Sequence, residues 1–224
     1  MKASQLLIKS LAGTLIFLFI LFFSAGRINY WQGWLYASVN IACLFLNSYA
    51  LGKNEELAEE RSKVRSDTKS WDKKILALSA LVLIITYVVA GLDSGRYLWS
   101  SRFHWSVHAS GVILLLLGEA LFLSAQKENK FFSSVVRIQS DRGHTVCDTG
   151  VYKTVRHPAY SGMIATAIGI PLILGSLWCF IPAVCSILLT VIRTSLEDKT
   201  LVRELNGYSE YVSRTPSRLI PHVW

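Results

Sequence analysis

Charged residues are scarce in this sequence of 224 residues, where Asp, Glu, Lys and Arg together make up 17%. Ordinary soluble domains carry roughly a quarter. Apolar and aromatic residues account for 52%, and the mean hydropathy is +0.39. These values favour an integral membrane protein over a soluble one. The net charge of +8 would also suit a nucleic-acid-binding protein, so the distribution of the charges along the chain has to decide between them.

Cysteine is rare as well, and its spacing is uninformative. The four cysteines are Cys43, Cys147, Cys179 and Cys185, and no two of them have C-x-x-C spacing. A disulfide framework or a structural zinc site is therefore not expected, and we predict no metal ion. The sequence also lacks a G-x-G-x-x-G motif after a strand and any βαβ pattern, which excludes a Rossmann domain.

Long apolar runs are what the sequence has instead. A helix needs about 20 mostly apolar residues to cross the hydrocarbon core. Four candidates lie at residues 11–25, 31–51, 75–92 and 105–125. A longer stretch at 159–192 is broken at Gly175-Ser176, which predicts a helical hairpin that turns there, with arms of about 16 residues. The sequence therefore predicts an all-α, polytopic membrane helix bundle with about six crossings.

The first of these runs has a second interpretation. It follows Lys2 and Lys9 and ends in small residues, which is also the layout of a signal peptide. Trp31 and Trp34 follow at once and are typical of an aromatic belt at the membrane interface. We therefore expect a retained helix.

Basic residues alternate between the two sides of the predicted bundle. The N-terminal tail, residues 53–74, residues 127–156 and the tail from residue 193 hold 2, 7, 6 and 5 Lys and Arg, so 20 of the 23. By the positive-inside rule these segments and both termini are cytoplasmic. The charge thus indicates membrane orientation, and we expect no nucleic-acid partner.

Two polar features lie outside the C-terminal region. Residues 53–74 are charged, and Glu59 and Lys63 have the i,i+4 spacing of a surface helix. We expect a solvated loop against anionic headgroups. Glu119 lies within the fourth apolar run, where an acid indicates either a functional site bordering an acceptor tunnel or a hydrogen bond to a neighbouring helix.

Residues 129–162 form the polar segment on which we expect the chemistry. The segment is basic, is punctuated by glycine, and leads into the apolar stretch that begins at residue 159. Pro158 predicts the first turn of a helix, and His157 before it is restricted to extended backbone. Arg156 and His157 therefore lie at the mouth of a membrane helix, where free backbone N–H groups and the helix dipole bind carboxylates and phosphates.

Two blocks on either side of the hairpin resemble a known family. Gly150-Val151-Tyr152 followed by Arg156-His157-Pro158-Ala159-Tyr160-Ser161-Gly162 is similar to the G-x-Y-x-x-x-R-H-P-x-Y-x-G signature of the isoprenylcysteine carboxyl methyltransferases and the related phospholipid methyltransferases. The second block contains Arg193, Glu197-Asp198, Gly207-Tyr208, Tyr211 and the tail Thr215-Pro216-Ser217-Arg218-Leu219-Ile220-Pro221. It departs from the family in having Glu-Asp for Glu-Glu and an additional Ser217.

The resemblance covers about residues 129–221 and implies an S-adenosylmethionine-dependent methyltransferase, specifically a carboxyl O-methyltransferase. It implies a cytoplasm-facing cofactor pocket without a Rossmann domain, and a lipophilic acceptor that approaches from the bilayer. The implied cofactor-binding residues are Gly150, Tyr152, Arg156, His157, Pro158, Tyr160, Glu197, Asp198 and Tyr208, and the implied catalytic residues are Arg193, Glu197 and His157.

The chemistry of S-adenosylmethionine suits these residue types. Arg156 and the helix mouth can hold its carboxylate, Glu197 or Asp198 its amino group or ribose hydroxyls, and the tyrosines its adenine or sulfonium. A carboxylate acceptor is already anionic at pH 7 and needs no base, so Arg193 would orient it. An amine or thiol acceptor would need a base, and His157 or Glu197 is the candidate.

We predict two regions, with transmembrane helices that shape the acceptor side at 1–128 and the cofactor-binding region with the hairpin at 129–224. The acceptor implied is the carboxylate of an isoprenylated cysteine, although another lipid, thiol or isoprenoid acid stays open. The membrane is a bacterial inner membrane or the endoplasmic reticulum. The alternatives are a membrane NADPH-dependent reductase of the sterol-reductase type, disfavoured by Pro158 and Met163, and a non-enzymatic transporter or scaffold, disfavoured by the absence of repeated halves.

Overall fold

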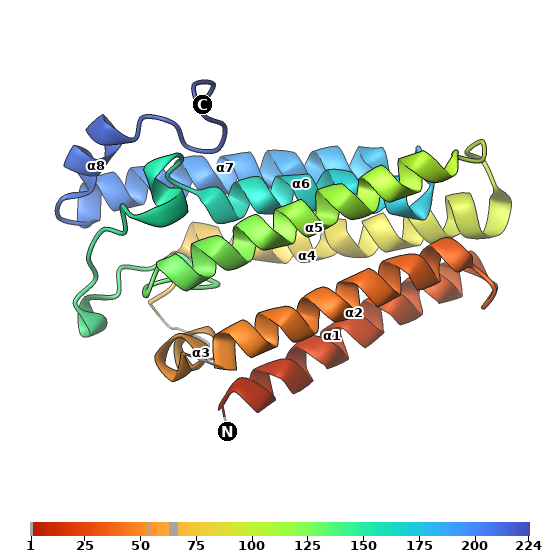
Figure 1. Ribbon diagram of the computed structural model, residues 1–224, viewed down its shortest axis with the longest axis horizontal. Helices are drawn as coiled ribbons and strands as arrows, with labels where there is room; N and C mark the ends of the chain where they lie inside the picture. The colour runs from red at the N-terminus through yellow and green to blue at the C-terminus, as the bar shows by residue number, and fades with distance from the viewer. Residues whose placement is uncertain (1, 53, 63–66) are drawn as a thin grey trace.

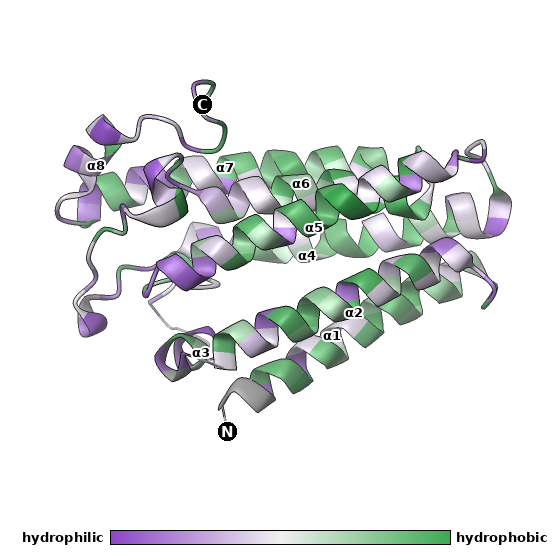
Figure 2. Cartoon of the chain, in the orientation of Figure 1, coloured by the Kyte–Doolittle hydropathy of each residue, from purple (hydrophilic) through white to green (hydrophobic). Residues whose placement is uncertain are grey.

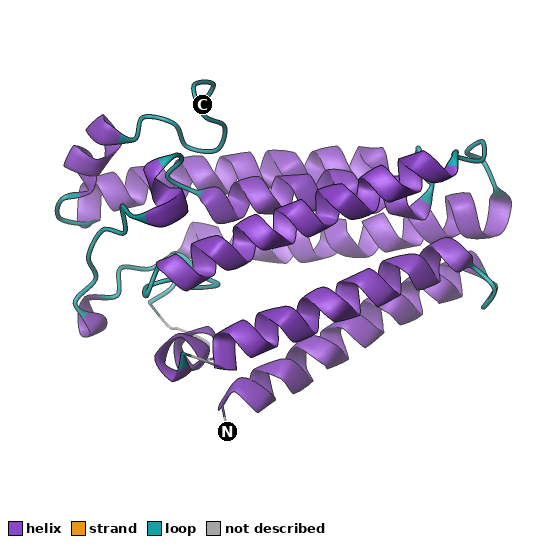
Figure 3. Cartoon of the chain, viewed as in Figure 1, coloured by secondary structure: helices purple, strands orange, loops and turns teal. Residues whose placement is uncertain are grey.

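The computed structural model describes residues 2–52, 54–62 and 67–224. Every regular element in these ranges is helical (Figure 3). The helices are α1 (Lys2–Ala25), α2 (Trp31–Gly52), α3 (Glu55–Ser62), α4 (Ser70–Ala90) with a π-helical continuation (Gly91–Tyr97), α5 (Trp105–Glu128), α6 (Pro158–Leu174), α7 (Phe180–Glu204) and α8 (Tyr208–Arg214), with short 3₁₀ turns at Ser140–Arg142 and Gly150–Lys153. The predicted all-α membrane helix bundle is confirmed.

Five of the described helical segments are long and apolar enough to cross a membrane: Gln5–Ala25, Trp31–Gly52, Ser70–Tyr97, Trp105–Glu128 and Phe180–Glu204. The helix α6 is also apolar but has 17 residues. Figure 1 shows these six helices running along the long axis, with α3, α8 and both chain ends at one end of the bundle. Hydrophilic residues gather at that end (Figure 2). That it faces the cytoplasm stays a prediction.

The charged stretch after α2 differs from the expectation of a solvated loop. Leu57, Ala58 and Glu60 of α3 are 3%, 1% and 2% exposed. The helix is therefore a packed element, because it lies against α1 and α2 and Glu60 forms a buried ion pair with Arg137. Lys63 lies outside the described residues. The following helix, α4, begins at Ser70, five residues before the apolar run, so that Asp72 falls in its first turn, where the helix dipole favours an acid.

The hairpin of α6 and α7 turns where the sequence predicts. α6 ends at Leu174, and the following Gly175 has a φ of +68°, a left-handed conformation that glycine adopts without strain. The Ser176 hydroxyl donates to Asp93 at 2.5 Å, which ties the turn to the end of α4. The second arm is longer than predicted, because the helix continues past the apolar run to Glu204. This extension presents Arg193, Glu197 and Asp198 at the polar end of the bundle.

The helices α5 and α6 cross with their backbones in close contact. A Cβ atom at Gly118 would lie 2.5 Å from the carbonyl oxygen of Gly162 and 2.7 Å from the Thr166 hydroxyl. One heptad away, a Cβ at Gly111 would lie 2.8 Å from the backbone nitrogen of Ile173. Small residues at a helix crossing allow such approach in membrane bundles. This packing fixes α6, which begins at the proline of the Arg-His-Pro motif, against α5.

We expect the substitution Gly118→Val to lower the thermal midpoint of the detergent-solubilised protein. The added side chain meets backbone atoms that cannot move aside, and overpacking of this kind costs about 1–3 kcal/mol. Gly13→Val on α1 is the matched control, because no atom lies within 4 Å of a Cβ built there. Equal midpoints for the two variants, measured by differential scanning fluorimetry, would contradict the close crossing.

Candidate active site

A cavity of about 270 Å³ lies at the polar end of the bundle. Its walls come from α5, α6, α7 and the connection between α5 and α6, and Arg61 of α3 closes one side. Of the residues singled out from the sequence, Tyr152, Arg156, His157, Tyr160, Arg193 and Glu197 line it. Gly150, Pro158, Asp198 and Tyr208 do not line this cavity. The hairpin and the loop before it are thus brought together, as the two sequence blocks predict.

Asp198 is the centre of a buried cluster behind the cavity wall. Its two carboxylate oxygens accept hydrogen bonds from Arg156 Nε and Nη2, each at 2.8 Å, and from Arg218 Nε at 2.8 Å. Tyr208 donates from its hydroxyl at 3.0 Å, and His157 Nε2 lies at 3.2 Å. Burial and the neighbouring Asp198 carboxylate raise the pKa of the Tyr208 hydroxyl, so it is a neutral donor at pH 7. Asp198 therefore holds four side chains of the two sequence blocks in place.

Arg156 anchors the C-terminal tail through the same cluster. Its Nη1 donates to the backbone carbonyls of Thr215 and Pro216 at 2.8 and 2.7 Å, and its backbone nitrogen donates to Ser217 at 3.0 Å. The backbone nitrogen of His157 donates to the carbonyl of Arg218 at 2.9 Å. The first helical turn of α6 and the tail are thereby joined. A contact of Arg156 with a cofactor carboxylate stays a prediction, since most of its donors already have partners in the chain.

Glu197 and Tyr160 present the polar groups that face the cavity. The Tyr160 hydroxyl donates to Glu197 Oε2 at 2.5 Å, and the other oxygen, Oε1, has no hydrogen bond with any residue that the structure describes. The His157 ring stacks on the Tyr160 ring with their centroids 5.8 Å apart. The arrangement offers one acceptor oxygen next to two aromatic faces, which suits a cationic or hydroxyl-bearing ligand.

Arg193 is held on one side only. Asp72 of α4 accepts from its Nε at 2.8 Å and from its Nη2 at 3.2 Å, and the Ser134 carbonyl accepts from Nη2 at 3.0 Å. Asp72 is fully buried and also accepts from the backbone nitrogen of Val136 at 2.8 Å. The guanidinium carbon lies 5.4 Å from the centre of the Tyr160 ring. Nη1 makes no hydrogen bond within the described ranges, and the Arg193 side chain lines the cavity.

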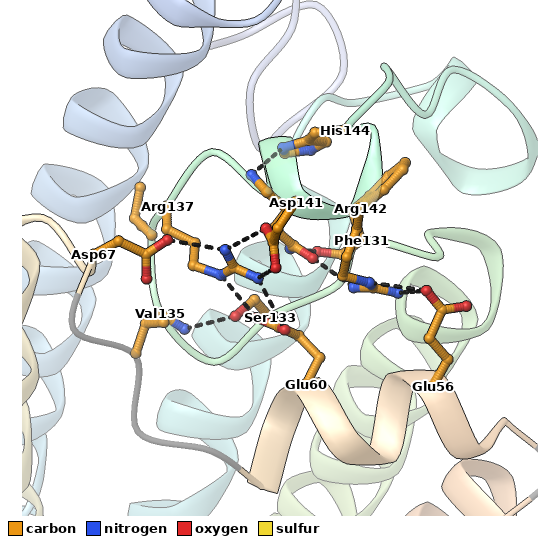
Figure 4. A network of polar contacts seen from close by, with 12 residues as sticks. Glu56, Glu60, Asp67, Phe131, Ser133, Val135, Arg137, Asp141, Arg142 and His144 are labelled. Atoms are coloured by element: carbon orange, nitrogen blue, oxygen red, sulfur yellow. Dashed lines mark hydrogen bonds and ion pairs between the residues drawn. The ribbon is translucent and has the colours of Figure 1, made fainter.

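The helix α3 is fastened over the cavity by ion pairs with the connection after α5. Arg137 donates from Nε and Nη2 to Glu60 at 2.9 and 3.0 Å, and these two side chains are 2% and 1% exposed. On its other side Arg137 contacts Asp67 and Asp141, each at 2.9 Å. Figure 4 shows Glu60 on one side of the guanidinium and the two aspartates on the other. The Glu60 carboxylate raises the pKa of Arg137 further, so the cation is permanent.

His144 supports the same connection as a neutral ring. Burial, together with the charges of Arg137 and Arg142, lowers the pKa of His144 to about 4. The ring is therefore uncharged at pH 7, and its Nδ1 can accept from the backbone nitrogen of Gln139 at 3.2 Å. The ring also packs on Phe131, with centroids 4.6 Å apart. His144 and Phe131 both line the cavity, so the connection forms a rigid wall of it.

Several residues that line the cavity or hold a lining side chain in place were missed from the sequence. Asp72 gives no signal of its pairing, because its partner Arg193 is 121 residues away. Arg61 lies in the stretch interpreted as a solvated loop, and residues 131–135 carry no motif of their own. The one local signal for Asp72 is its place just before an apolar run, where it can fall in the first turn of a membrane helix.

Comparisons with known proteins support the resemblance that the two sequence blocks indicate. Residues 106–207 match the phospholipid methyltransferase family model. The protein-S-isoprenylcysteine O-methyltransferase B of Arabidopsis thaliana is 25% identical over 151 residues, which cover 64% of this chain and 73% of that protein. A probable protein-S-isoprenylcysteine O-methyltransferase of Oryza sativa subsp. indica is 33% identical over 67 residues, covering 30% of this chain and 35% of the rice protein.

The human protein-S-isoprenylcysteine O-methyltransferase is 28% identical over 163 residues, which cover 65% of this chain and 56% of the human protein. A solved structure of a eukaryotic intramembrane Ras methyltransferase, an isoprenylcysteine carboxyl methyltransferase, superposes with a TM-score of 0.65 at 18% identity. That superposition covers 95% of this chain and 75% of the other, and it shows a shared fold. The resemblance predicted from the sequence is thus confirmed, and this multi-pass membrane chain is related to the isoprenylcysteine carboxyl methyltransferases.

Proposed function

We propose that this protein is an S-adenosylmethionine-dependent methyltransferase that transfers a methyl group to the carboxylate of a lipophilic acceptor, an isoprenylated cysteine being the acceptor that the relatives' names suggest. The observation that carries the proposal is the cavity at the polar end of the bundle, which both sequence blocks line. In this proposal residues 129–224 bind the cofactor and residues 1–128 shape the acceptor side. The cavity opens to the cytoplasm, since 20 of the 23 basic residues lie in segments assigned to that side.

The residues of the cavity fit S-adenosylmethionine by their chemistry. The free Glu197 oxygen suits its amino group or a ribose hydroxyl, and the rings of Tyr160, Phe131 and Phe132 suit its adenine and sulfonium. Asp198 and Tyr208 act in this proposal by holding Arg156 and His157, which do line the cavity. When bound, the cofactor supplies an activated methyl group on a positively charged sulfur.

The chain's own residues contribute position and charge. An acceptor carboxylate is ionised at pH 7, so no proton has to be removed and no general base is needed. The free Nη1 of Arg193 holds the carboxylate, while Asp72 fixes the rest of the guanidinium. Alignment of nucleophile and methyl group within a cavity from which water is displaced then accounts for most of the rate. His157, whose ring nitrogen lies against Asp198, is the base that an amine or thiol acceptor would require.

Equilibrium binding in detergent tests the proposal. S-adenosylmethionine, S-adenosylhomocysteine and NADPH are titrated into the purified protein by isothermal calorimetry. We expect saturable binding of the two adenosyl ligands and none of NADPH. In the Glu197→Gln variant we expect about 10-fold to 100-fold weaker binding of both, since a hydrogen bond to a charged group contributes about 1.5–3 kcal/mol.

The matched control is Glu210→Gln, which alters an exposed glutamate on α8 and should leave both affinities unchanged. Binding of NADPH in place of the adenosyl ligands would establish the reductase alternative. If none of the three ligands bound, the result would support the alternative of a non-enzymatic transporter or scaffold.

A further inference from the structure

A second cavity of about 230 Å³ lies between α1, α2 and α5. Although it is formed by apolar membrane helices, its walls carry hydroxyl and amide groups from Ser10, Thr14, Asn40, Asn47 and Ser48. It also has one cation, Arg61, and one acid, Glu119. Polar groups inside a membrane bundle are expensive and indicate a ligand site or a solvated path. None of these residues has a role in the cofactor binding proposed above, although Arg61 also lines the first cavity.

Arg61 borders both cavities. It is the residue of α3 that reaches the cofactor cavity, and it is placed there by the buried pairing of its neighbour Glu60 with Arg137. A group held by Arg61 would therefore lie between the second cavity and the cofactor. This is the position that the reacting carboxylate of an acceptor has to occupy.

Arg61 has no acidic partner among the residues that the structure describes. Its Nη1 donates to the amide oxygen of Gln126, and its guanidinium carbon lies 5.6 and 5.3 Å from the ring centres of Phe122 and Phe132. Burial lowers the pKa of Arg61 to about 10, because removal from water penalises the charged form. A partly buried guanidinium without a carboxylate is unusual, and such groups bind carboxylates through two parallel hydrogen bonds.

Glu119 is a partly buried acid that, like the Arg61 cation, has no partner of opposite charge among the described residues. It lies in the membrane-crossing part of α5, and it forms no hydrogen bond or ion pair with any described residue. It lines the same cavity as Arg61, but the two side chains do not form an ion pair. The cavity therefore offers a donor for an anion at one place and an acceptor for an N–H group at another. A ligand with both groups would satisfy both residues.

We propose that this second cavity binds the head of the methyl acceptor. Arg61, together with Arg193 on the wall of the cofactor cavity, holds the reacting carboxylate at the junction of the two cavities, and Glu119 accepts from an N–H group of the same molecule. The acceptor class is an amphiphile with an amino-acid-like head, which has a carboxylate and an N–H group a few bonds apart. The polar walls suit the head rather than an alkyl chain, which extends into the bilayer. The inference rests on the proposed methyltransferase function.

The test uses N-acetyl-S-farnesylcysteine as the probe and its carboxamide as the matched uncharged analogue. Both are titrated into the protein saturated with S-adenosylhomocysteine, in detergent. We expect the carboxylate to bind at least 10-fold more tightly than the carboxamide. In Arg61→Gln this preference should disappear while the affinity for S-adenosylhomocysteine stays within 2-fold. Arg203→Gln, which alters an exposed arginine of α7, is the control and should change neither.

A second variant keeps the proposal testable if Arg61→Gln does not fold. Glu119→Leu removes an acid that pairs with no described residue, so its thermal midpoint should be unchanged or higher, yet the affinity for both probes should fall at least 3-fold. Unchanged probe affinity in Glu119→Leu would overturn the proposal, as would a wild-type protein that binds S-adenosylhomocysteine but does not prefer the carboxylate. A 10-fold loss of S-adenosylhomocysteine affinity in a folded Arg61→Gln would make Arg61 a cofactor ligand instead. Failure of the wild type to bind S-adenosylhomocysteine would reject the methyltransferase function itself.

Discussion

The substitution Asp198→Asn should lower the thermal midpoint of the protein by about 10 °C and abolish binding of adenosyl ligands. Asp198 is 3% exposed and accepts from two arginines, a tyrosine and a histidine. Asparagine keeps the shape but removes the negative charge, which leaves buried cations uncompensated. Breaking a buried ion pair in this way costs about 3–5 kcal/mol, and about 1 kcal/mol corresponds to 2–4 °C in a domain of this size.

The loss of binding would follow from the position of the cluster. Arg156 joins the first turn of α6 to the carbonyls of Thr215 and Pro216 through the same guanidinium that pairs with Asp198. When the pair is weakened, the tail and the cavity wall are released together. Fluorescence-detected melting and calorimetry on the same preparations measure both effects.

The matched control is Asp148→Asn. Asp148 forms an ion pair with Arg214 at 2.7 Å, but the two side chains are 34% and 65% exposed. Exposed pairs contribute about 0–1 kcal/mol, so the midpoint should move by no more than a few degrees. If Asp198→Asn and Asp148→Asn shifted the midpoint equally, the cluster around Asp198 would not be the structural centre that its geometry indicates.

The sequence predicted the fold well because a membrane helix is recognised from the hydropathy of its own residues alone. Each apolar run needs only its own residues to be recognised, and the glycine that turns the hairpin at Gly175 lies within the run that it interrupts. The helix ends were less accurate, since the run that ends near residue 192 gives no reason for α7 to continue to Glu204. That continuation depends on contacts of Arg193 and Asp198 with distant parts of the chain.

The site was predicted as a set of residues but not as a set of contacts. The two sequence blocks identified Arg156, Asp198 and Tyr208, yet a motif does not say that they bind one another rather than a ligand. The pairings that decide this join residues 42 and 121 positions apart, Arg156 with Asp198 and Asp72 with Arg193. Arg61 was not recognised for the same reason, because its importance comes from two cavities that exist only in the folded bundle.

The substitution Asp72→Asn should reduce the rate of methyl transfer to N-acetyl-S-farnesylcysteine by about 100-fold while the affinity for S-adenosylhomocysteine changes less than 3-fold. Asp72 touches no ligand in the proposed mechanism and is a positioning residue. It fixes Nε and Nη2 of Arg193 and so leaves Nη1 for the acceptor carboxylate in the proposed mechanism. With asparagine, which can accept through one oxygen only, the guanidinium is free to turn, and misplacement of about 1 Å costs about 10²-fold in rate.

The division between kcat and KM distinguishes this role from a merely structural one. A loose Arg193 still supplies its charge, so acceptor binding should weaken only slightly and the loss should appear in kcat. Arg193→Lys should give a similar loss, because an ammonium group cannot bind Asp72 through two nitrogens and the acceptor through a third. In the double variant Asp72→Asn/Arg193→Lys the two losses should not multiply, since both remove the same alignment. Multiplicative losses, or a fall in S-adenosylhomocysteine affinity equal to the fall in kcat, would show that Asp72 stabilises the cofactor site as a whole and does not position Arg193.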